Sequence, residues 1–309
     1  MFVYRFSGID VWMTCGLRMC ECALQGTTIE HLEDILNVVK KIIKFEKHQA
    51  NKKIMTYNYN LEWLTDKFDQ GEILKFLFFW GHSNSLKEQV GKFCFSQWFE
   101  LPFIVDNITY ETAEHWMMAN KALLFNDINT HQKIIKAKSP GKAKELGRQI
   151  VGFDEQIWVA NRYDIVVKGN IHKFNQYPQF ANFLINTKDR ILVEASPVDK
   201  IWGIGLSKDA EQIDNPYFWN GQNLLGFALM EVRDFLTKFS CFNYIDSPVT
   251  PPWKSHPQID PQDLFWSMGN GEDTLSKFSS YYDSLVDSDK TIFRLSNPNP
   301  YNWSDFYDS

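Results

Sequence analysis

Five segments between residues 112 and 239 repeat apolar residues at the three- and four-residue spacing of an amphipathic helix, and no other feature limits the fold of this chain as strongly. Thr112 suits a helix N-cap, and Ser139 before Pro140 is a second helix-start signal. The middle of the chain is therefore predicted to be mostly helical. Helices are expected at residues 112–125, 140–150, 154–168, 178–186 and 224–239.

Short strands are predicted at three places in the same region. Residues 76–80 (FLFFW) form an apolar run that ends at Gly81, residues 92–98 (KFCFSQW) alternate large and small side chains, and residues 192–195 are a third candidate. Together with the helices, they indicate an α+β domain that is predominantly helical and has a few short strands.

The two ends of the chain differ from this central region. Residues 29–45 have the spacing of an amphipathic helix, which indicates a helical N-terminal extension over residues 1–70. Residues 241–309 contain ten Asp and Glu against four Lys and Arg, with seven of the twelve prolines. We expect an irregular tail, partly disordered or docked, whose aromatic rings pack on the body or bind a protein partner. The central domain then spans residues 71–240.

The distribution of charge argues against one class of protein, those that bind long nucleic acids through a broad basic surface. The 309 residues carry a formal net charge of −6, and the C-terminal tail accounts for all of it, so the rest of the chain has no broad basic surface for capturing long nucleic acids. A local cationic pocket for one or two phosphates remains possible.

The cysteines and the N-terminal residues indicate in which cellular compartment the protein is expected. Five cysteines without a CxxC pair predict neither a disulfide framework nor a zinc knuckle, which fits a reducing, cytoplasmic compartment. Arg5, Asp10, Arg18 and Glu21 interrupt the N-terminus before any apolar stretch reaches the length of a signal peptide or a membrane span. We expect no membrane association.

Familiar cofactor signatures are missing. The chain has no complete GxGxxG, no phosphate-binding loop and no HExxH, and its seven histidines are scattered. No cofactor and no metal site are predicted.

The segment TYETAEHWMMANKALLF is the first candidate for chemistry. Glu114 falls in the first turn of its helix and Lys121 lies seven residues later on the same face, about 10 Å away in rise. A carboxylate and an ammonium beside apolar residues are partly desolvated, which shifts their pKa values. Alternatively, Glu114 is only a helix N-terminal acid and Lys121 a surface lysine.

A second candidate is the loop EASPVDKIWGIGL. Asp199 follows a predicted strand, while Trp202 and Gly203 place a flat ring beside backbone that a ligand can approach closely. The alternative is a loop stabilised by Asp capping and a buried Trp.

Trp158 and Arg162 form a third candidate. They are four residues apart on one helix face, where a ring can stack on a base while a guanidinium binds phosphate. A core Trp with a surface Arg explains the same spacing.

Taken together, these motifs resemble the YbiA-like, or NADAR, family of N-glycosidases. The similarity runs from about Phe76 to Leu236 through FFWGH, FSQWFELPF, YETAEHWMMANKALLFND, SPGKAKELGRQI, EASPVDKIWGIGL and WNGQNLLGFALMEVRDFL, in family order. The resemblance implies catalytic roles for Glu114, Asp199, Trp158 and Lys121. We expect the substrate to contact Trp202, Gly203, Arg162, Ser96, Trp98 and Asn223. Trp98 departs from relatives that have Phe there, so the wall of the substrate pocket differs.

The implied activity is hydrolysis of the bond between ribose C1 and a nitrogen in a phosphorylated ribosyl compound. The family's substrates imply either ADP-ribosylated guanine or phosphoribosyl-aminopyrimidine intermediates of riboflavin synthesis. An alternative is a non-catalytic module that binds ADP-ribose or another NAD derivative. A third reading makes the acidic tail a partner-docking segment and the domain subordinate to it.

Overall fold

The computed structural model describes residues 2–6, 9–13, 57–82, 89–303 and 306–308. The chain divides into two compact units, Met1–Glu46 and Lys47–Ser309. In the first unit, strands β1 (Phe2–Phe6) and β2 (Ile9–Met13) pair antiparallel, with Phe2 opposite Met13. The helix expected at residues 29–45 lies outside the described residues.

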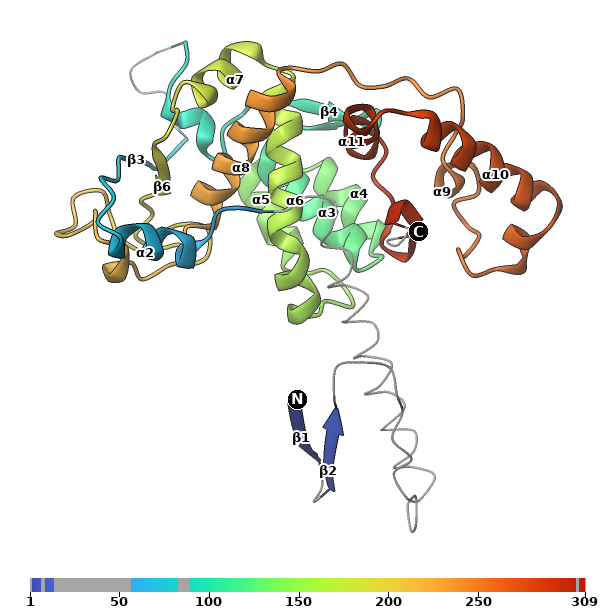
Figure 1. The fold of residues 1–309 in the computed structure, drawn as a ribbon, viewed down its shortest axis with the longest axis horizontal. Coiled ribbons are helices and arrows are strands. Elements are labelled where there is room, and N and C mark those ends of the chain that lie inside the picture. The colour runs from blue at the N-terminus through green and yellow to red at the C-terminus, as the bar shows by residue number, and fades with distance from the viewer. Residues whose placement is uncertain (1, 7–8, 14–56, 83–88, 304–305, 309) are drawn as a thin grey trace. The chain divides into compact units, whose positions relative to one another are not determined.

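The second unit is built mainly from helices, and its short strands lie at the edges of the helical core (Figure 1). Its elements up to residue 239 are α2 (Leu61–Asp69), β3 (Phe76–Phe79), the 3₁₀ turn η2 (Lys92–Phe95), β4 (Phe103–Val105), β5 (Ile108–Tyr110), α3 (Ala113–Leu124), α4 (Ile128–Ile135), α5 (Pro140–Gly147), α6 (Glu155–Asn175), α7 (Pro178–Ile185), β6 (Ile191–Glu194), η3 (Pro216–Phe218) and α8 (Leu224–Phe239). The predicted α+β class, predominantly helical with few short strands, is confirmed.

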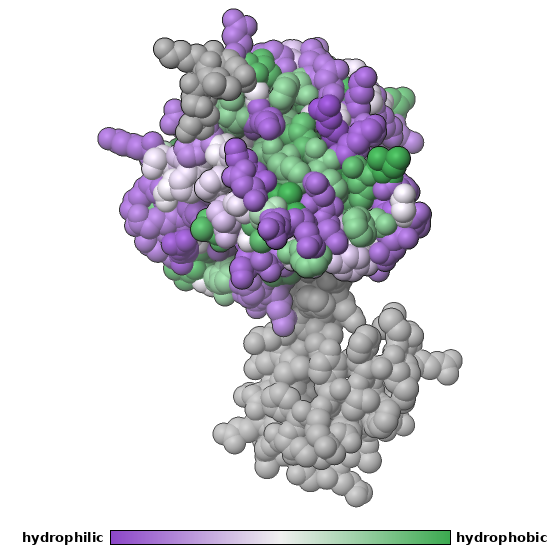
Figure 2. Space-filling view, turned by 90° about the vertical axis from the view of Figure 1, so that its left-hand side faces the viewer, coloured by the Kyte–Doolittle hydropathy of each residue, from purple (hydrophilic) through white to green (hydrophobic). Residues whose placement is uncertain are grey.

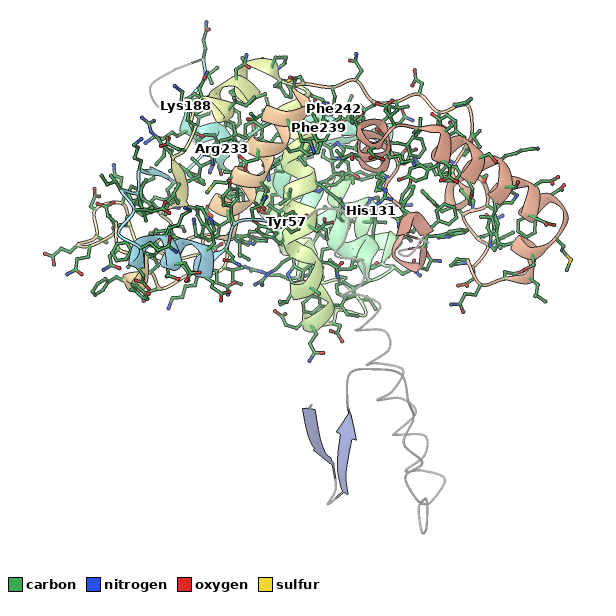
Figure 3. The ribbon with its side chains drawn as sticks, in the orientation of Figure 1. Tyr57, His131, Lys188, Arg233, Phe239 and Phe242 are labelled. Atoms are coloured by element: carbon green, nitrogen blue, oxygen red, sulfur yellow. The ribbon has the colours of Figure 1, made fainter. Side chains whose placement is uncertain are left out.

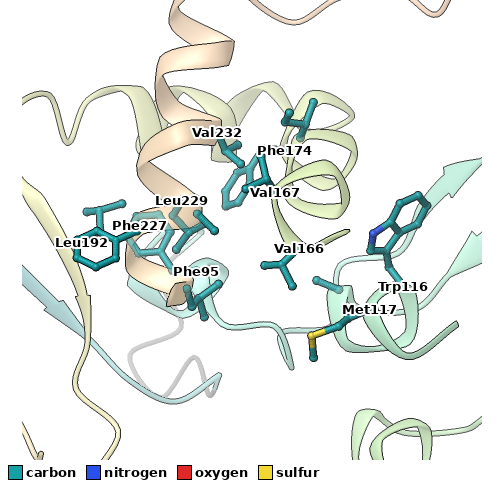
Figure 4. Close-up of a cluster of buried hydrophobic side chains, with 14 of the residues drawn as sticks. Phe95, Trp116, Met117, Val166, Val167, Phe174, Leu192, Phe227, Leu229 and Val232 are labelled. Atoms are coloured by element: carbon teal, nitrogen blue, oxygen red, sulfur yellow. The ribbon is translucent and has the colours of Figure 1, made fainter. Parts of the chain in front are cut away.

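The core lies where α3, α6 and α8 meet β6. Figure 4 shows Trp116 and Met117 of α3, Val166 of α6 and Leu192 of β6 among the side chains of this cluster. Gly169 of α6 permits this packing, because a Cβ there would lie 2.3 Å from the Trp116 ring. The apolar stripes predicted from the sequence are the faces that these helices bury.

Strands β3 and β6 pair in parallel, with Phe76 opposite Ile191 and Phe79 opposite Glu194. Both strands therefore end at the same edge, where the chain enters the loops that begin at Trp80 and Ala195. Ligand sites of α/β proteins form at such carboxyl ends. The sheet thus presents Glu194 and the EASPVDKIWG loop together.

Residues 57–60 cross the helical core ahead of α2. Tyr57 lies beside α6 (Figure 3), and its hydroxyl donates to Asp164 of α6 at 2.6 Å. The backbone N–H groups of Asn58 and Tyr59 both donate to Glu231 of α8. This part of the predicted N-terminal extension therefore packs on the helical core. Helix α2 was not predicted.

The strand predicted at residues 92–98 is wrong, because η2 occupies most of it. The carbonyls of Cys94 and Ser96 accept hydrogen bonds from the buried ammonium of Lys173, at 2.7 and 3.0 Å, rather than from a neighbouring strand. Sequence analysis also missed α4 and the β4–β5 hairpin, whose turn places Asp106 and Asn107 at positive φ.

The C-terminal segment is more regular than the irregular tail that its composition predicted. It contains α9 (Pro252–Ser255), η4 (Leu264–Ser267), α10 (Gly269–Ser284), α11 (Asp287–Ser296), η5 (Tyr301–Trp303) and η6 (Phe306–Asp308). A cluster of aromatic side chains holds these elements together, because it buries rings that would otherwise face water. Its buried members are Trp253, Trp266, Phe278, Tyr282, Phe293, Trp303 and Tyr307.

Figure 2 shows hydrophobic surface between hydrophilic side chains on the face seen from the side of α2, β3 and β6. Exposed apolar side chains of this region include Ile73, Trp80, Tyr217 and Phe218. Across the described ranges, no helix is both long and apolar enough to span a bilayer.

Candidate active site

Glu114 occupies the first turn of α3, as its spacing from Thr112 predicted. The Thr112 hydroxyl caps the helix, and the Glu114 N–H donates to the Gln97 carbonyl at 3.0 Å. The side chain is only 2% exposed, and its Oε1 has no hydrogen-bond partner among the described residues. A buried carboxyl oxygen without a protein partner is costly unless a ligand or water uses it.

Burial raises the pKa of Glu114 to about 7. The charge of Lys144 and a hydrogen bond from the Trp98 indole oppose this rise, while Asp199 adds to it. Glu114 thus titrates near neutral pH, beside a group that favours its charged form.

Glu194 supplies a second carboxyl group that sequence analysis missed; the residue is partly exposed, and its Oε2 is fully buried. It ends β6, and its Oε2 has no hydrogen-bond partner in the described part of the chain. Burial, with the charges of Asp199 and Glu114, raises its pKa to about 8, and the charge of Lys144 opposes this rise. An acidic residue that closes a buried apolar run, as in ILVE, was the signal that could have found it.

Asn223 fixes the backbone of β6 beside this group. It adopts a left-handed conformation, with φ of 53°, just before α8. Its Oδ1 accepts from the Glu194 N–H at 3.0 Å, and its Nδ2 donates to the Leu192 carbonyl at 2.9 Å. Both polar ends of this fully buried amide are thus occupied. Substrate contact was predicted for Asn223, but the geometry makes it a support for Glu194.

Asp199 holds the loop that follows β6. One oxygen, Oδ1, accepts from the N–H groups of Ile201 and Trp202, both at 2.8 Å. Asp199 is nevertheless close enough to raise the pKa values of Glu114 and Glu194. It therefore has both a capping role in the loop and an electrostatic effect on the two glutamates.

Gly203 and Trp202 belong to the same loop. A Cβ on Gly203 would lie 2.8 Å from the Glu194 carbonyl, so this glycine permits close packing of loop and strand. Trp202 is half-buried and lies against the core. The predicted contact of Gly203 with substrate is untested, whereas its packing role is evident.

Lys121 of α3 and Trp158 of α6 lie together. The Lys121 ammonium is 5.2 Å from the centre of the Trp158 ring and 4.1 Å from that of Phe153, and it donates to the Gly147 carbonyl at 3.0 Å. Burial lowers the pKa of Lys121, and Glu155 opposes this effect. The result is a half-buried amine stacked between rings.

Arg162 lies one turn beyond Trp158 on α6. Its guanidinium donates to Gln222 at 3.3 Å and is buried, which lowers its pKa, while Glu155 and Asp199 oppose this shift. The interaction with Asp199 indicates that Arg162 lies near the loop after β6.

Ser96 and Trp98 lie in the turn after η2. The Ser96 hydroxyl accepts from the Trp98 N–H at 3.1 Å, and Gln97 donates to Asn170 of α6 at 3.2 Å. Together with Lys173, these contacts fix the turn against α6 and place the Trp98 indole at Glu114. Lys144 of α5, 5.9 Å from the Trp98 ring centre, was not among the predicted site residues.

The site contains carboxyl groups, cations and rings, which suits acid–base chemistry on an anionic ligand. Within the residues described, no group of three His, Cys, Asp or Glu side chains is arranged to hold a metal ion.

Comparison with known proteins gives a match to the NADAR domain over residues 78–237. The chain is 42% identical over 167 residues to N-glycosidase R617 of Acanthamoeba polyphaga mimivirus, covering 52% of this chain and 95% of that protein. It is 34% identical over 135 residues to the chloroplastic riboflavin biosynthesis protein PYRR of Zea mays, covering 41% of this chain and 20% of that protein.

A solved relative is also found. N-glycosidase YbiA of Escherichia coli is 30% identical over 142 residues, which cover 46% of this chain and 80% of YbiA. Its NMR structure aligns with a TM-score of 0.43 at 24% identity, over 56% of this chain and 93% of that structure.

Proposed function

Because residues 78–237, more than half of its length, place this chain in the NADAR domain family, we propose that it is an N-glycosidase hydrolysing the bond between a ribose C1 and a base or amine nitrogen. Relatives named N-glycosidase support this proposal. The observation that carries it is the pair of buried, partly unpartnered carboxyl groups of Glu114 and Glu194.

Cleavage of an N-ribosidic bond needs two kinds of help. The sugar becomes positively charged, like an oxocarbenium ion, as the bond to nitrogen breaks, and a nearby carboxylate stabilises that charge. The departing nitrogen needs a proton, which a carboxylic acid with a raised pKa supplies. Water then adds to C1 and gives up a proton. Two carboxyl groups in different electrostatic environments meet both needs.

We assign the two roles from these environments. Glu194, with a pKa of about 8, is protonated at neutral pH and donates its proton to the leaving nitrogen. Glu114 has the lower pKa because the Trp98 indole and Arg148 favour its charged form in addition to Lys144, which acts on both glutamates, so Glu114 stabilises the sugar and receives the proton from water. Asp199 is not assigned as the acid, because its Oδ1 already accepts hydrogen bonds from two backbone N–H groups.

The positive and aromatic groups suit the rest of a phosphorylated ribosyl substrate. Lys121 and Arg162 supply charge for phosphate, while Trp158 and Trp202 offer ring faces for a base or the ribose. Candidate substrates are ADP-ribosylated guanine and phosphoribosyl-aminopyrimidine intermediates of riboflavin synthesis. The similarity to PYRR supports the second, over the matched fifth of that protein.

A binding module without catalysis is less favoured. Such a module gains nothing from two buried carboxyl groups, which would repel the diphosphate of ADP-ribose. Rings and cations alone would suffice for binding.

The decisive experiment incubates the full chain with both substrate types and detects the released base or amine by mass spectrometry. Turnover of either by the wild type, with at least a hundredfold loss in Glu114→Gln, supports the proposal. Exposed Glu100→Gln is the matched control and should turn over normally. Tight binding of ADP-ribose without release of any base would favour the binding module.

A further inference from the structure

A second positively charged feature lies outside the candidate active site. Helix α4, helix α5 and the turn between them line an open hollow of about 540 Å³. Four of its lining residues are lysines, and none is acidic. In a chain with a net charge of −6, such a local excess of positive charge is unusual.

The lysines come from three successive pieces of chain. Lys133 lies on α4, Lys136 and Lys138 lie in the turn after it, and Lys142 lies on α5. Asn129 and Gln132 share a face of α4 with Lys133 and Lys136, at the three- and four-residue spacing of one helix side. The hollow is therefore a single continuous surface.

Two of these four lysines have acidic neighbours in the described part of the chain, and two do not. Lys142 forms an ion pair with Glu145 at 2.8 Å, and the charge of Lys133 helps to lower the pKa of Asp127. For Lys136 and Lys138, the described residues provide no ion pair. Ammonium groups on flexible stems bind phosphate as point charges, and the amides of Asn129 and Gln132 add hydrogen-bond donors. The hollow has no aromatic lining, so it suits phosphates rather than bases.

A hydrogen bond joins the turn that lines the hollow to the helix that carries Glu114. Ala137, which lines the hollow, accepts a hydrogen bond from His115 Nε2 at 3.1 Å, and His115 follows Glu114 in α3. On α5, Lys142 faces the hollow while Lys144 acts on Glu114. Lys142 and Lys144 are two residues apart, so they point to different sides of α5, and the hollow is a site separate from the carboxyl cluster.

We propose that this hollow is a binding site for two or more phosphate groups of one ligand, held by Lys133, Lys136, Lys138 and Lys142. The source of the phosphates is either the backbone of a nucleic-acid strand or the diphosphate of an ADP-ribosyl compound. The proposal does not depend on hydrolysis, because binding alone tests it.

The test measures binding of a fluorescent single-stranded 12-mer and, separately, of ADP-ribose to the full chain at several salt concentrations. The variant Lys136→Gln with Lys138→Gln should weaken at least one ligand about tenfold at low salt. For the 12-mer, the slope of log affinity against log salt should fall by about 1 to 2. The exposed pair Lys238→Gln with Lys277→Gln makes the same change in net charge and is the control.

If Lys136→Gln with Lys138→Gln weakens binding of the 12-mer alone, the ligand of the hollow is a phosphodiester chain. If it weakens binding of ADP-ribose alone, the ligand is a diphosphate. The proposal is overturned if neither ligand binds, or if both double variants weaken binding equally. Unchanged thermal unfolding of the variants shows that the fold is intact, as expected for exposed side chains.

Discussion

The carboxyl group of Glu194, at the end of β6, lies close enough to that of Glu114, in the first turn of α3, for the charge of Glu114 to raise its pKa. The two residues come from elements eighty positions apart in the sequence, and Lys144 lowers the pKa of both. This arrangement favours one proton shared between two acids near neutral pH.

The first prediction separates the roles of the two glutamates. Glu194→Gln removes the proton donor, so turnover of a substrate with a poor leaving nitrogen should fall at least a hundredfold. A pyridinium ribosyl substrate, whose nitrogen needs no proton, should be affected less than tenfold. Glu114→Gln should slow both substrates alike. Equal losses for both substrates in Glu194→Gln would contradict the assignment of the acid.

The second prediction concerns pH and stability. The folded-state pKa of Glu114, about 7, exceeds the unfolded value of 4.5, so the folded state holds the extra proton between these pH values. Its contribution to stability is present below pH 4.5 and is lost as pH rises to 7, by roughly 3 kcal/mol at most. For Glu194 the loss continues to about pH 8.

Urea unfolding from pH 4.5 to 8 measures this effect. The free energy of unfolding should fall less steeply with pH in Glu114→Gln and in Glu194→Gln than in the wild type. The Glu100→Gln control should follow the wild type. Parallel curves for all four proteins would show that neither group is desolvated as described.

The third prediction concerns Lys121. Burial lowers the pKa of this amine, which increases the fraction able to attack the aldehyde of an opened ribose. Borohydride added during turnover should reduce the resulting imine and leave a stable adduct on the peptide that contains Lys121. Lys121→Arg keeps the charge and should give no adduct. Absence of an adduct in the active wild type would limit Lys121 to charge binding.

The fourth prediction concerns Lys173, which is 0% exposed and is a positioning residue. Its ammonium, with a pKa that burial lowers to about 8, holds the carbonyls of Cys94 and Ser96. Without it the turn loosens, the Trp98 indole leaves Glu114, and the pKa of Glu114 rises. In Lys173→Met the acidic limb of the pH–turnover profile should therefore move to higher pH.

Trp98→Phe removes the same indole hydrogen bond directly and serves as the matched variant. Both variants should shift the limb in the same direction. A shift in Trp98→Phe combined with an unchanged profile in Lys173→Met would leave Lys173 with a structural role only.

The fifth prediction concerns Gly226 of α8. A Cβ there would lie 2.0 Å from the Leu192 carbonyl and 2.5 Å from the Asn223 amide, both of which are fixed. Gly226→Ala should lower the free energy of unfolding by about 1–3 kcal/mol. Gly141→Ala, whose Cβ would lie an ordinary 3.7 Å from the Trp98 ring, should be neutral or stabilising by up to about 1 kcal/mol. Equal urea midpoints would contradict the packing described.

Periodicity and capping predicted the helices best. Helix α8 has the predicted limits, and α3 starts after the predicted cap Thr112. The helix predicted to end at Lys168 continues to Asn175, because Gly169 serves packing against Trp116 rather than helix termination. The alternating pattern of residues 92–98 wrongly predicted a strand. There the buried ammonium of Lys173, and not a neighbouring strand, donates a hydrogen bond to the carbonyl of Cys94.

The candidate site was only partly predictable. Glu114 and Lys121 follow from one helix, and Trp158 and Arg162 from another, because spacing along a helix fixes their shared face. Glu194 was missed because its importance depends on the parallel pairing with β3, which brings two distant strands to one edge. No local pattern encodes such a pairing.

That pairing of β3 with β6 also makes the place of Glu194 depend on distant parts of the chain. The pairing of Phe76 with Ile191 fixes the strand that ends at Glu194, and Asn223, which hydrogen-bonds the Glu194 backbone, comes later in the sequence. A chain that ends before Asn223 lacks the amide that holds the backbone of Glu194.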